Sequence, residues 1–483
     1  MGSRAMTQAE RAELERWIEM IYEKALELGL DPYPVHFEVV PAHVIYELGA
    51  YGLPARFSHW TFGRDYHVQK TMYEYGISRI YELVFNADPA QAFLLDVNDM
   101  LSHKLVIAHV YGHSDFFKHN IYFEHTDRRM IERARLHAER IRQYEAQYGP
   151  LVVEQFLDAV LSIEEHIDPV LPTHGGLSRP EPSREEQPVG ETYEDLFYMV
   201  QPKPKPQPKP RKIPEEPQKD LLLFIRDHSR VLEDWQRDII SMVREEMIYF
   251  LPQIKTKIMN EGYATFWHER ILENLPLTAD EHVQFRKMHA SVVQPTSRLS
   301  LNPYYVGYKI FRDIERRWNG ELEPEEQERD WMGYPIERPS GQGLQRVFEV
   351  RQMECDQSFL HKYLTERLVR ELDLYTYRVE EQDGELVWVV DETDWRKVRD
   401  ALVDQLTNFG VPVLTVEDGD WEHRGELYIK HHYDGKPLDM ERTTRCLRYL
   451  VKLWGRPVHI ETVVDDELTL ISCDGQSITQ NAL

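Results

Sequence analysis

Cysteine is scarce in this chain of 483 residues. The three cysteines, Cys355, Cys446 and Cys473, lie far apart and form no Cys-x-x-Cys pair. Neither a disulfide framework nor a cysteine-ligated zinc site is therefore expected. The pattern is typical of a protein from a reducing compartment, and we expect a cytoplasmic location.

Long apolar runs are missing as well. No stretch of the sequence approaches the roughly 18 uninterrupted apolar residues that indicate a membrane helix. The first residues pass directly into an amphipathic, acidic segment, whereas a secretion signal would have an apolar centre. We expect neither a membrane span nor export.

Basic residues are fewer than acidic ones: the chain has 57 Lys and Arg residues and 83 Asp and Glu residues, which gives a formal net charge of −26. Binding to a nucleic acid requires basic groups that contact phosphates, and this surface would repel them. A nucleic-acid partner is therefore not expected. Such a surface is typical of a well-solvated protein, and docking of basic partners is the alternative use.

The hydrophobic content of 42% is enough for a large core divided among two or three domains. Helical periodicity runs through residues 1–171 and again through residues 221–375, whereas residues 172–220 hold 11 of the 28 prolines and read as a linker or long excursion. Residues 380–483 follow the order β-α-β-β-α-β. We expect a mainly α main domain in two halves and a small C-terminal α+β module.

A pair of histidines lies in the helical stretch "IAHVYGHSDFFKHN". His109 and His113 are four residues apart, a spacing that places two imidazoles on one face of a helix, where both can bind one metal ion. A zinc hydrolase of the HExxH kind has a glutamate after the first histidine, but this chain has Val110. Gly112 lowers helix propensity by about 1 kcal/mol relative to Ala, which favours close approach of another backbone at this point.

A second stretch, "IMNEGYATFWHERI", places Glu261, Ala264 and His268 on one helix face. In zinc peptidases of the HExxH kind the third ligand is often a glutamate from a separate helix in a similar small-residue setting. We therefore predict a divalent metal, zinc in the first place, bound by His109, His113 and Glu261. The alternative is that the histidines only pack and that Glu261 caps a helix.

Val110 cannot take a proton from a metal-bound water, so a general base has to come from elsewhere. We predict Glu165 as this base, because it ends a helix in the same His-rich half, and His268 as the group that stabilises an oxyanion. Two further interpretations stay open: the metal is structural, or no metal binds.

A carboxylate-bridged two-metal centre is a separate alternative, because several carboxylates and histidines fall on predicted helices. The paired Glu-x-x-His motifs of that class are absent from the sequence. The residues concerned are Glu164, Glu165, His166, Asp168, Glu245, Glu246 and His289.

Long ordered motifs along nearly the whole chain resemble the SpoVR family, the stage V sporulation protein R proteins. They include "YGLPARFSHWTFGRDY", "YELVFNADPAQAFLLDVND", "VIAHVYGHSDFFKHN", "HASVVQP", "LNPYYVGYKIFRDI" and "LYIKHHYDGKPLD". The resemblance implies a cytoplasmic bacterial protein linked to assembly of the spore cortex. In relatives that do not form spores, it implies association with a PrkA-type serine kinase and a von Willebrand factor A-like protein. It implies no particular reaction.

Two functions of different classes follow. The first is a metal-dependent hydrolase acting on a peptide or a cell-wall precursor, and the second is a non-catalytic regulator or scaffold for other sporulation or kinase-pathway proteins. We expect the C-terminal module to serve interaction, because its adjacent histidines, His431 and His432, point to opposite faces of a strand and cannot share one ion.

Overall fold

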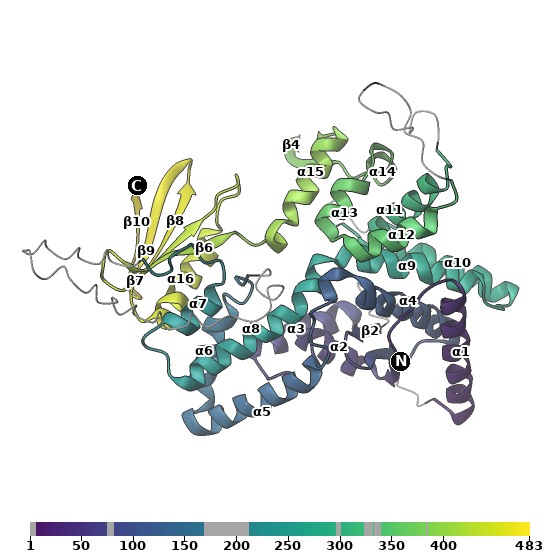
Figure 1. Cartoon of the computed structure of the whole chain (residues 1–483), viewed down its shortest axis with the longest axis horizontal. Coiled ribbons are helices and arrows are strands. Elements are labelled where there is room, and N and C mark those ends of the chain that lie inside the picture. Colours follow the sequence, from purple (N-terminus) through teal and green to yellow (C-terminus); the bar gives the residue numbers. More distant parts are fainter. Residues whose placement is uncertain are drawn as a thin grey trace, which may run out of the picture. The chain divides into compact units, whose positions relative to one another are not determined.

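The computed structural model of the chain describes residues 6–74, 82–168, 212–295, 301–322, 332, 340–382 and 385–483. The chain divides into two compact units (Figure 1). The first unit comprises Met1–Val153 and Ile248–Val411, and the second comprises Glu154–Met247 and Pro412–Leu483. Most of the predicted linker, residues 172–220, lies outside the described residues.

The first unit is mainly helical, as the periodicity predicts. Its first helix, α1, starts with a capping box in which Thr7 and Glu10 bond to each other's backbone N–H groups. Its helices are α1 (Gln8–Glu27), α2 (Ala42–Tyr51), α3 (Trp60–Glu74), α4 (Met100–His119), α5 (Met130–Tyr148), α9 (Lys257–Glu273), α10 (Ala279–Val292), α11 (Pro303–Trp318), α12 (Gly343–Met353), α13 (Asp356–Tyr363), α14 (Glu366–Glu371) and α15 (Trp395–Gln405).

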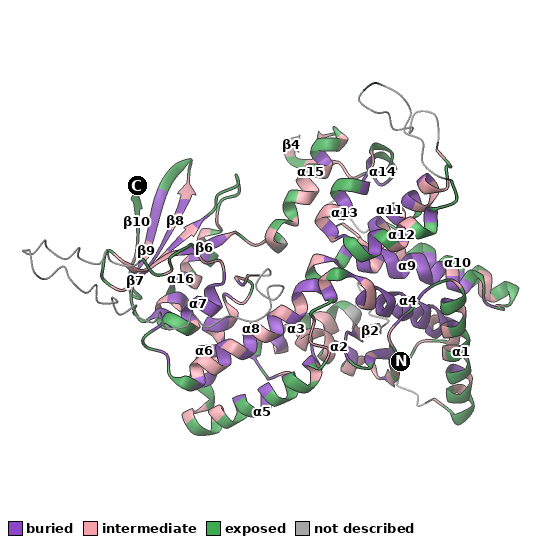
Figure 2. Cartoon of the chain, viewed as in Figure 1, coloured by how far each residue is buried: buried purple, intermediate pink, exposed green. Residues whose placement is uncertain are grey.

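Helices α4, α9 and α11 form the centre of this unit, and α4 and α9 are coloured as buried along most of their length in Figure 2. Small residues allow the close packing. A Cβ atom added to Gly112 of α4 would lie 2.7 Å from the Cα atom of Ala264 in α9. On the other side of α9, a Cβ atom added to Gly262 would lie 2.4 Å from the Cα atom of Gly307 in α11. Helix α9 is therefore held between two neighbours at backbone contact.

Two small sheets also belong to the first unit. One has the order β1-β3-β2, with β1 (Val35–Val40) parallel and β2 (Glu82–Phe85) antiparallel to β3 (Ala90–Leu95). The other is the hairpin of β4 (Thr376–Gln382) and β5 (Glu385–Glu392).

The second unit contains a five-stranded sheet of order β10-β9-β8-β7-β6, packed with α7 (Leu221–His228) and α16 (Met440–Trp454). The strands are β6 (Leu414–Trp421), β7 (Glu426–His431), β8 (Val458–Val464), β9 (Glu467–Cys473) and β10 (Ile478–Ala482). Two further helices, α6 (Pro150–Leu161) and α8 (Asp234–Lys255), each contain a boundary between the units.

The predicted order of strands and helices in the last hundred residues is present, and a C-terminal α+β module is confirmed. The sheet of that module nevertheless begins with β6. Strand β5, the first of the predicted order, pairs with β4 and lies with α15 in the first unit. The order of elements along a chain does not say which strands pair, because pairing depends on contacts distant in sequence.

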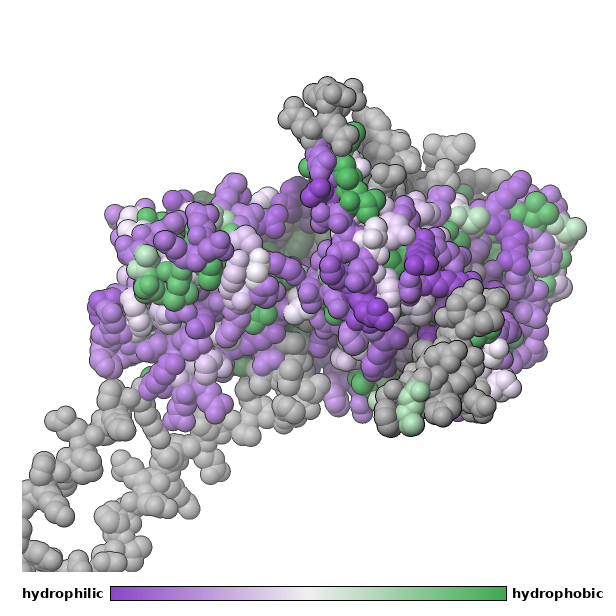
Figure 3. Space-filling model, turned by 90° about the horizontal axis from the view of Figure 1, so that it is seen from above, coloured by the Kyte–Doolittle hydropathy of each residue, from purple (hydrophilic) through white to green (hydrophobic). Residues whose placement is uncertain are grey.

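Hydrophilic residues cover most of the face seen in Figure 3, with scattered hydrophobic ones between them. Within the described part of the chain, no helix is both long and apolar enough to cross a bilayer.

Candidate metal centre

Helix α4 presents the two histidines of the predicted site. Its N-cap residue is Asp99, whose side chain accepts a hydrogen bond of 2.7 Å from the backbone N–H of Ser102. His109 and His113 are 2% and 5% exposed, and their ring centroids lie 4.6 Å apart. The prediction that the pair shares one face of one helix is confirmed.

Helix α9 presents Glu261. The start of α9 is held by the distant Asp356, whose carboxylate accepts hydrogen bonds from the backbone N–H groups of Ile258 (2.8 Å) and Met259 (2.9 Å). Glu261 follows two residues later, and the contact of Ala264 with Gly112 brings its helix against α4. Asp356 holds the helix before Glu261, and the contact of Ala264 with Gly112 holds it after Glu261. Glu261 therefore faces the histidine pair.

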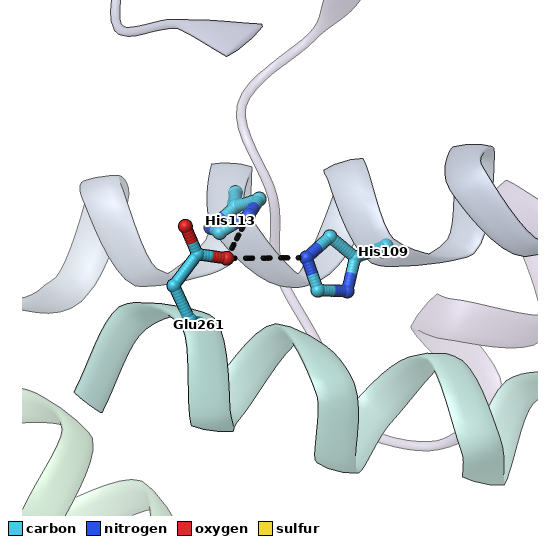
Figure 4. Close-up of side chains that lie close together, drawn as sticks. All are labelled: His109, His113 and Glu261. Atoms are coloured by element: carbon cyan, nitrogen blue, oxygen red, sulfur yellow. Dashed lines mark hydrogen bonds and ion pairs between the residues drawn. The ribbon is translucent and has the colours of Figure 1, made fainter. Parts of the chain in front are cut away.

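Three ligand atoms converge between the two helices (Figure 4). The Oε2 atom of Glu261 lies 3.4 Å from Nε2 of His109 and 3.3 Å from Nε2 of His113. Ligand atoms at about 2.1 Å around a tetrahedral ion stand about 3.4 Å from one another. The donor types and the two distances to Glu261 therefore suit a zinc ion, and the ligand atoms of all three residues lie within 4.8 Å of one another.

The charges in the site also suit a cation. Burial lowers the pKa of His109 to about 4, so its imidazole is neutral at pH 7. Burial alone would raise the pKa of Glu261, but His113 and His109 together outweigh it and lower this pKa well below its usual range. The carboxylate of Glu261, whose side chain is 21% exposed, faces the neutral imidazole of His109. A divalent cation would compensate this partly buried negative charge.

Asn260 orients the second histidine. Nδ1 of His113 lies 2.9 Å from Oδ1 of Asn260, and because the amide oxygen only accepts, this nitrogen carries the proton. When the ring is neutral, the other nitrogen, Nε2, presents its lone pair toward the carboxylate of Glu261. A cation bound between the two would stabilise this arrangement. The sequence did not single out Asn260 as a site residue, although its place beside Glu261 was the available signal.

His268, the predicted oxyanion stabiliser, lies behind His109. The two Nδ1 atoms are 3.0 Å apart, and His268 is fully buried. Its Nε2 atom lies 3.0 Å from Nδ1 of His289. Burial lowers the pKa of both His268 and His289, so both rings are neutral. The structure therefore joins His268 to the site through His109, and its predicted catalytic role stays a prediction.

Tyr304 was missed from the sequence, where it appears only within an aromatic run. Its ring stacks on that of His109, with centroids 5.8 Å apart and planes at 24°. The ring of Phe117 stacks in the same way on His113, at 6.2 Å. Aromatic rings therefore cover both ligand histidines.

Glu165, the predicted general base, is exposed in the turn after α6 and belongs to the second unit, whereas the three ligand residues belong to the first. Its role stays a prediction. Among the residues that the structure describes, only His109, His113 and Glu261 form a group of three or more potential ligands close enough to share an ion. The described residues therefore give no support to the two-metal alternative.

The fold and the site define a class: a mainly helical protein with two buried histidines and a partly buried glutamate between two core helices, and a C-terminal α+β module. The chain belongs to the SpoVR family, because the model of "SpoVR like protein" matches residues 8–411 and that of "SpoVR-like C-terminal domain" matches residues 412–465. The resemblance seen in the sequence is thereby confirmed. The boundary between the two matches coincides with that between Val411 and Pro412.

A curated relative is the uncharacterized protein YcgB of Escherichia coli (strain K12). It is 30% identical to this chain over 464 residues, which cover 90% of this chain and 89% of the relative. No solved structure matches this chain.

Proposed function

We propose that this SpoVR-family protein is a zinc-dependent hydrolase of the cytoplasm that acts on a peptide or cell-wall precursor during formation of the spore cortex. The observation that carries the proposal is the convergence of His109, His113 and Glu261, whose ligand atoms all lie within 4.8 Å of one another. A bound zinc ion would supply Lewis-acid chemistry, polarising a carbonyl or lowering the pKa of a water molecule. The sporulation role and the substrate class rest on the family resemblance.

Different residues of the chain would bind the metal, orient its ligands and remove a proton. His109, His113 and Glu261 would hold the ion, and Asn260 would keep Nε2 of His113 turned toward it. Glu165 remains our candidate for the group that removes a proton, on the sequence argument alone.

A non-catalytic regulator is the second candidate, and a specific observation favours it. The position of the general base in an HExxH enzyme is taken by Val110, which is fully buried and cannot accept a proton. In that case the ion would be structural. The acidic surface would then serve to bind partners, for which the family resemblance suggests a PrkA-type serine kinase and a von Willebrand factor A-like protein.

Elemental analysis of the purified protein tests the metal site. We expect about one zinc per chain in the wild type and a loss of zinc in His109→Ala and Glu261→Gln. His119→Ala is the matched control, because His119 lies on the same helix but contacts Asp31. That variant should keep its zinc. Wild-type protein that takes up no divalent metal would overturn the proposal.

Complementation of a deletion strain tests whether the ion is required for function while the substrate is unknown. If the ion is required for function, His109→Ala and Glu261→Gln should both fail to complement at normal protein levels. A metal-free variant that complements fully would show that the ion is dispensable, and the hydrolase proposal would fall.

A further inference from the structure

A row of buried hydrogen bonds leads away from the candidate metal centre. It runs from Nδ1 of His109 to Nδ1 of His268 (3.0 Å) and from Nε2 of His268 to Nδ1 of His289 (3.0 Å). Beyond it, Nε2 of His289 lies 3.7 Å from the Oε1 atom of Glu269. The three imidazoles come from α4, α9 and α10, so the row crosses the core of the first unit.

Each ring in the row has to donate on one side and accept on the other. A neutral imidazole has one N–H group and one bare nitrogen, and both nitrogens of His109 and of His268 face a polar partner. His109 also has the backbone of Ala264 as a hydrogen-bond partner. Along the links between the rings two directions are available: every ring donates toward Glu269, or every ring donates toward Glu261.

The far end of the row favours donation toward Glu269. Its carboxylate also accepts hydrogen bonds from Tyr308 (2.7 Å), Arg286 (2.8 Å) and Arg312 (3.3 Å), so it is an anchored acceptor. In the opposite direction, the lone pair on Nε2 of His289 would face this carboxylate directly. At the other end of the row, the proposed metal ion would take up the lone pair that Nε2 of His109 turns toward Glu261.

We infer that His268, backed by His289 and Glu269, is a positioning residue that keeps His109 with its proton on Nδ1 and its bare Nε2 turned toward Glu261 and the metal. The inference rests on the proposed metal site. His268 would support His109 as Asn260 supports His113. In each case a neighbour accepts the N–H of Nδ1, which leaves Nε2 to bind the metal. Partners of this kind change metal affinity by about 10- to 100-fold when they are removed.

Zinc affinity of the metal-stripped full chain, measured by competition with a chromophoric chelator, tests the inference. His268→Leu removes the acceptor and should bind zinc about 10- to 100-fold more weakly than the wild type. His268→Asn places an amide oxygen near the position of Nδ1 and should restore most of the affinity. A merely structural role would not be rescued in this way, since Leu fills about the volume of His, whereas the smaller Asn leaves a cavity.

His103→Leu is the matched control. His103 lies on the same helix as His109 and is equally buried, and neither of its ring nitrogens has a hydrogen-bond partner in the described structure. This variant should bind zinc as the wild type does. If His268→Leu does not fold, His289→Leu tests the next link, and its zinc affinity should fall less than that expected for His268→Leu.

A second readout follows the proton directly. In the zinc-loaded wild type, nitrogen-15 NMR of labelled histidines should show His109 protonated on Nδ1, with Nε2 bound to the metal. Zinc bound through Nδ1 of His109, or equal zinc affinity in His268→Leu and the wild type, would overturn the inference and leave the metal site standing. Wild-type protein that binds no zinc would overturn both.

Discussion

At the scale of single residues, neighbours decide which nitrogen of each histidine is available. Oδ1 of Asn260 lies within hydrogen-bond distance of Nδ1 of His113 and favours a proton there. Nδ1 of His268 lies within the same kind of distance of Nδ1 of His109. Both Nε2 atoms then face the carboxylate of Glu261. The ligand set therefore depends on residues that would not themselves touch the ion.

The general base is the residue whose role is least supported by position. We predict that Glu165→Gln keeps its zinc and fails to complement, because the amide preserves the shape of the side chain but cannot accept a proton. Zinc content and complementation are measured together, with the adjacent Glu164→Gln as control. Full complementation by Glu165→Gln would remove it as the base and favour a structural ion.

Asp356 gives a prediction about pH. Burial raises the pKa of its carboxyl group from 3.8 to about 7, against the lowering effect of the two N–H groups that it accepts from. The native state then holds this proton more tightly than the unfolded chain, so this group lowers the free energy of unfolding as the pH rises from about 4 to about 7.

The side chain in Asp356→Asn cannot ionise, so this variant should not lose free energy of unfolding as the pH rises in the way that the wild type does. Its free energy of unfolding relative to the wild type should therefore rise by a few kcal/mol between pH 5 and pH 8. Denaturant unfolding of metal-free protein at both pH values measures the change. Parallel pH profiles for the two proteins would contradict the assignment of this dependence to Asp356.

At the scale of helices, the site depends on how closely α4 and α9 approach. Gly112 has no Cβ atom and faces Ala264, while Gly262 allows α11 to support α9 from its other side. The coordination distances of a metal site tolerate changes of only about 0.2 Å. Small residues at the helix contact are therefore as necessary to the site as its ligands.

Gly112→Ala tests this contact. The substitution would favour the helix by about 1 kcal/mol at an exposed position, but here its Cβ atom would lie 2.7 Å from the backbone of Ala264. We expect the helices to separate, with a loss of about 1–3 kcal/mol in the free energy of unfolding and a lower zinc affinity.

Gly63→Ala in α3 is the control, because an added Cβ atom at Gly63 meets nothing within 4 Å. That variant should keep wild-type zinc affinity and equal or higher stability. If Gly112→Ala binds zinc as tightly as Gly63→Ala does, the close contact does not set the ligand geometry.

At the scale of the whole molecule, all three candidate ligands lie in the first unit, and the five-stranded sheet lies in the second. Leu447 of α16 is fully buried in the second unit. A charge placed at this position would lose its hydration, which costs free energy of folding. We expect Leu447→Asp to lower the melting temperature of the second unit and to leave about one zinc per chain.

Differential scanning calorimetry and elemental analysis check this expectation. Leu447→Ala is a milder companion, which removes the same contacts without adding a charge. Loss of zinc in parallel with unfolding of the second unit would show that the candidate metal centre depends on both units.

The sequence by itself was sufficient for the features that repeat locally. Apolar periodicity predicts α1 and α4, and the spacing of His109 and His113 places both on one helix face. The family could also be recognised, because its motifs extend along nearly the whole chain. These signals span a few residues at a time, so they do not depend on how distant segments pack.

Only the tertiary structure decided which distant residues meet. Glu261 lies 152 positions after His109, and the contact of Gly112 with Ala264 brings the two together. The same packing places His268 behind His109, assigns Glu165 to the second unit and pairs β5 with β4. Periodicity says which face of a helix is buried, but the neighbour buried against that face is chosen by the packing of the whole core.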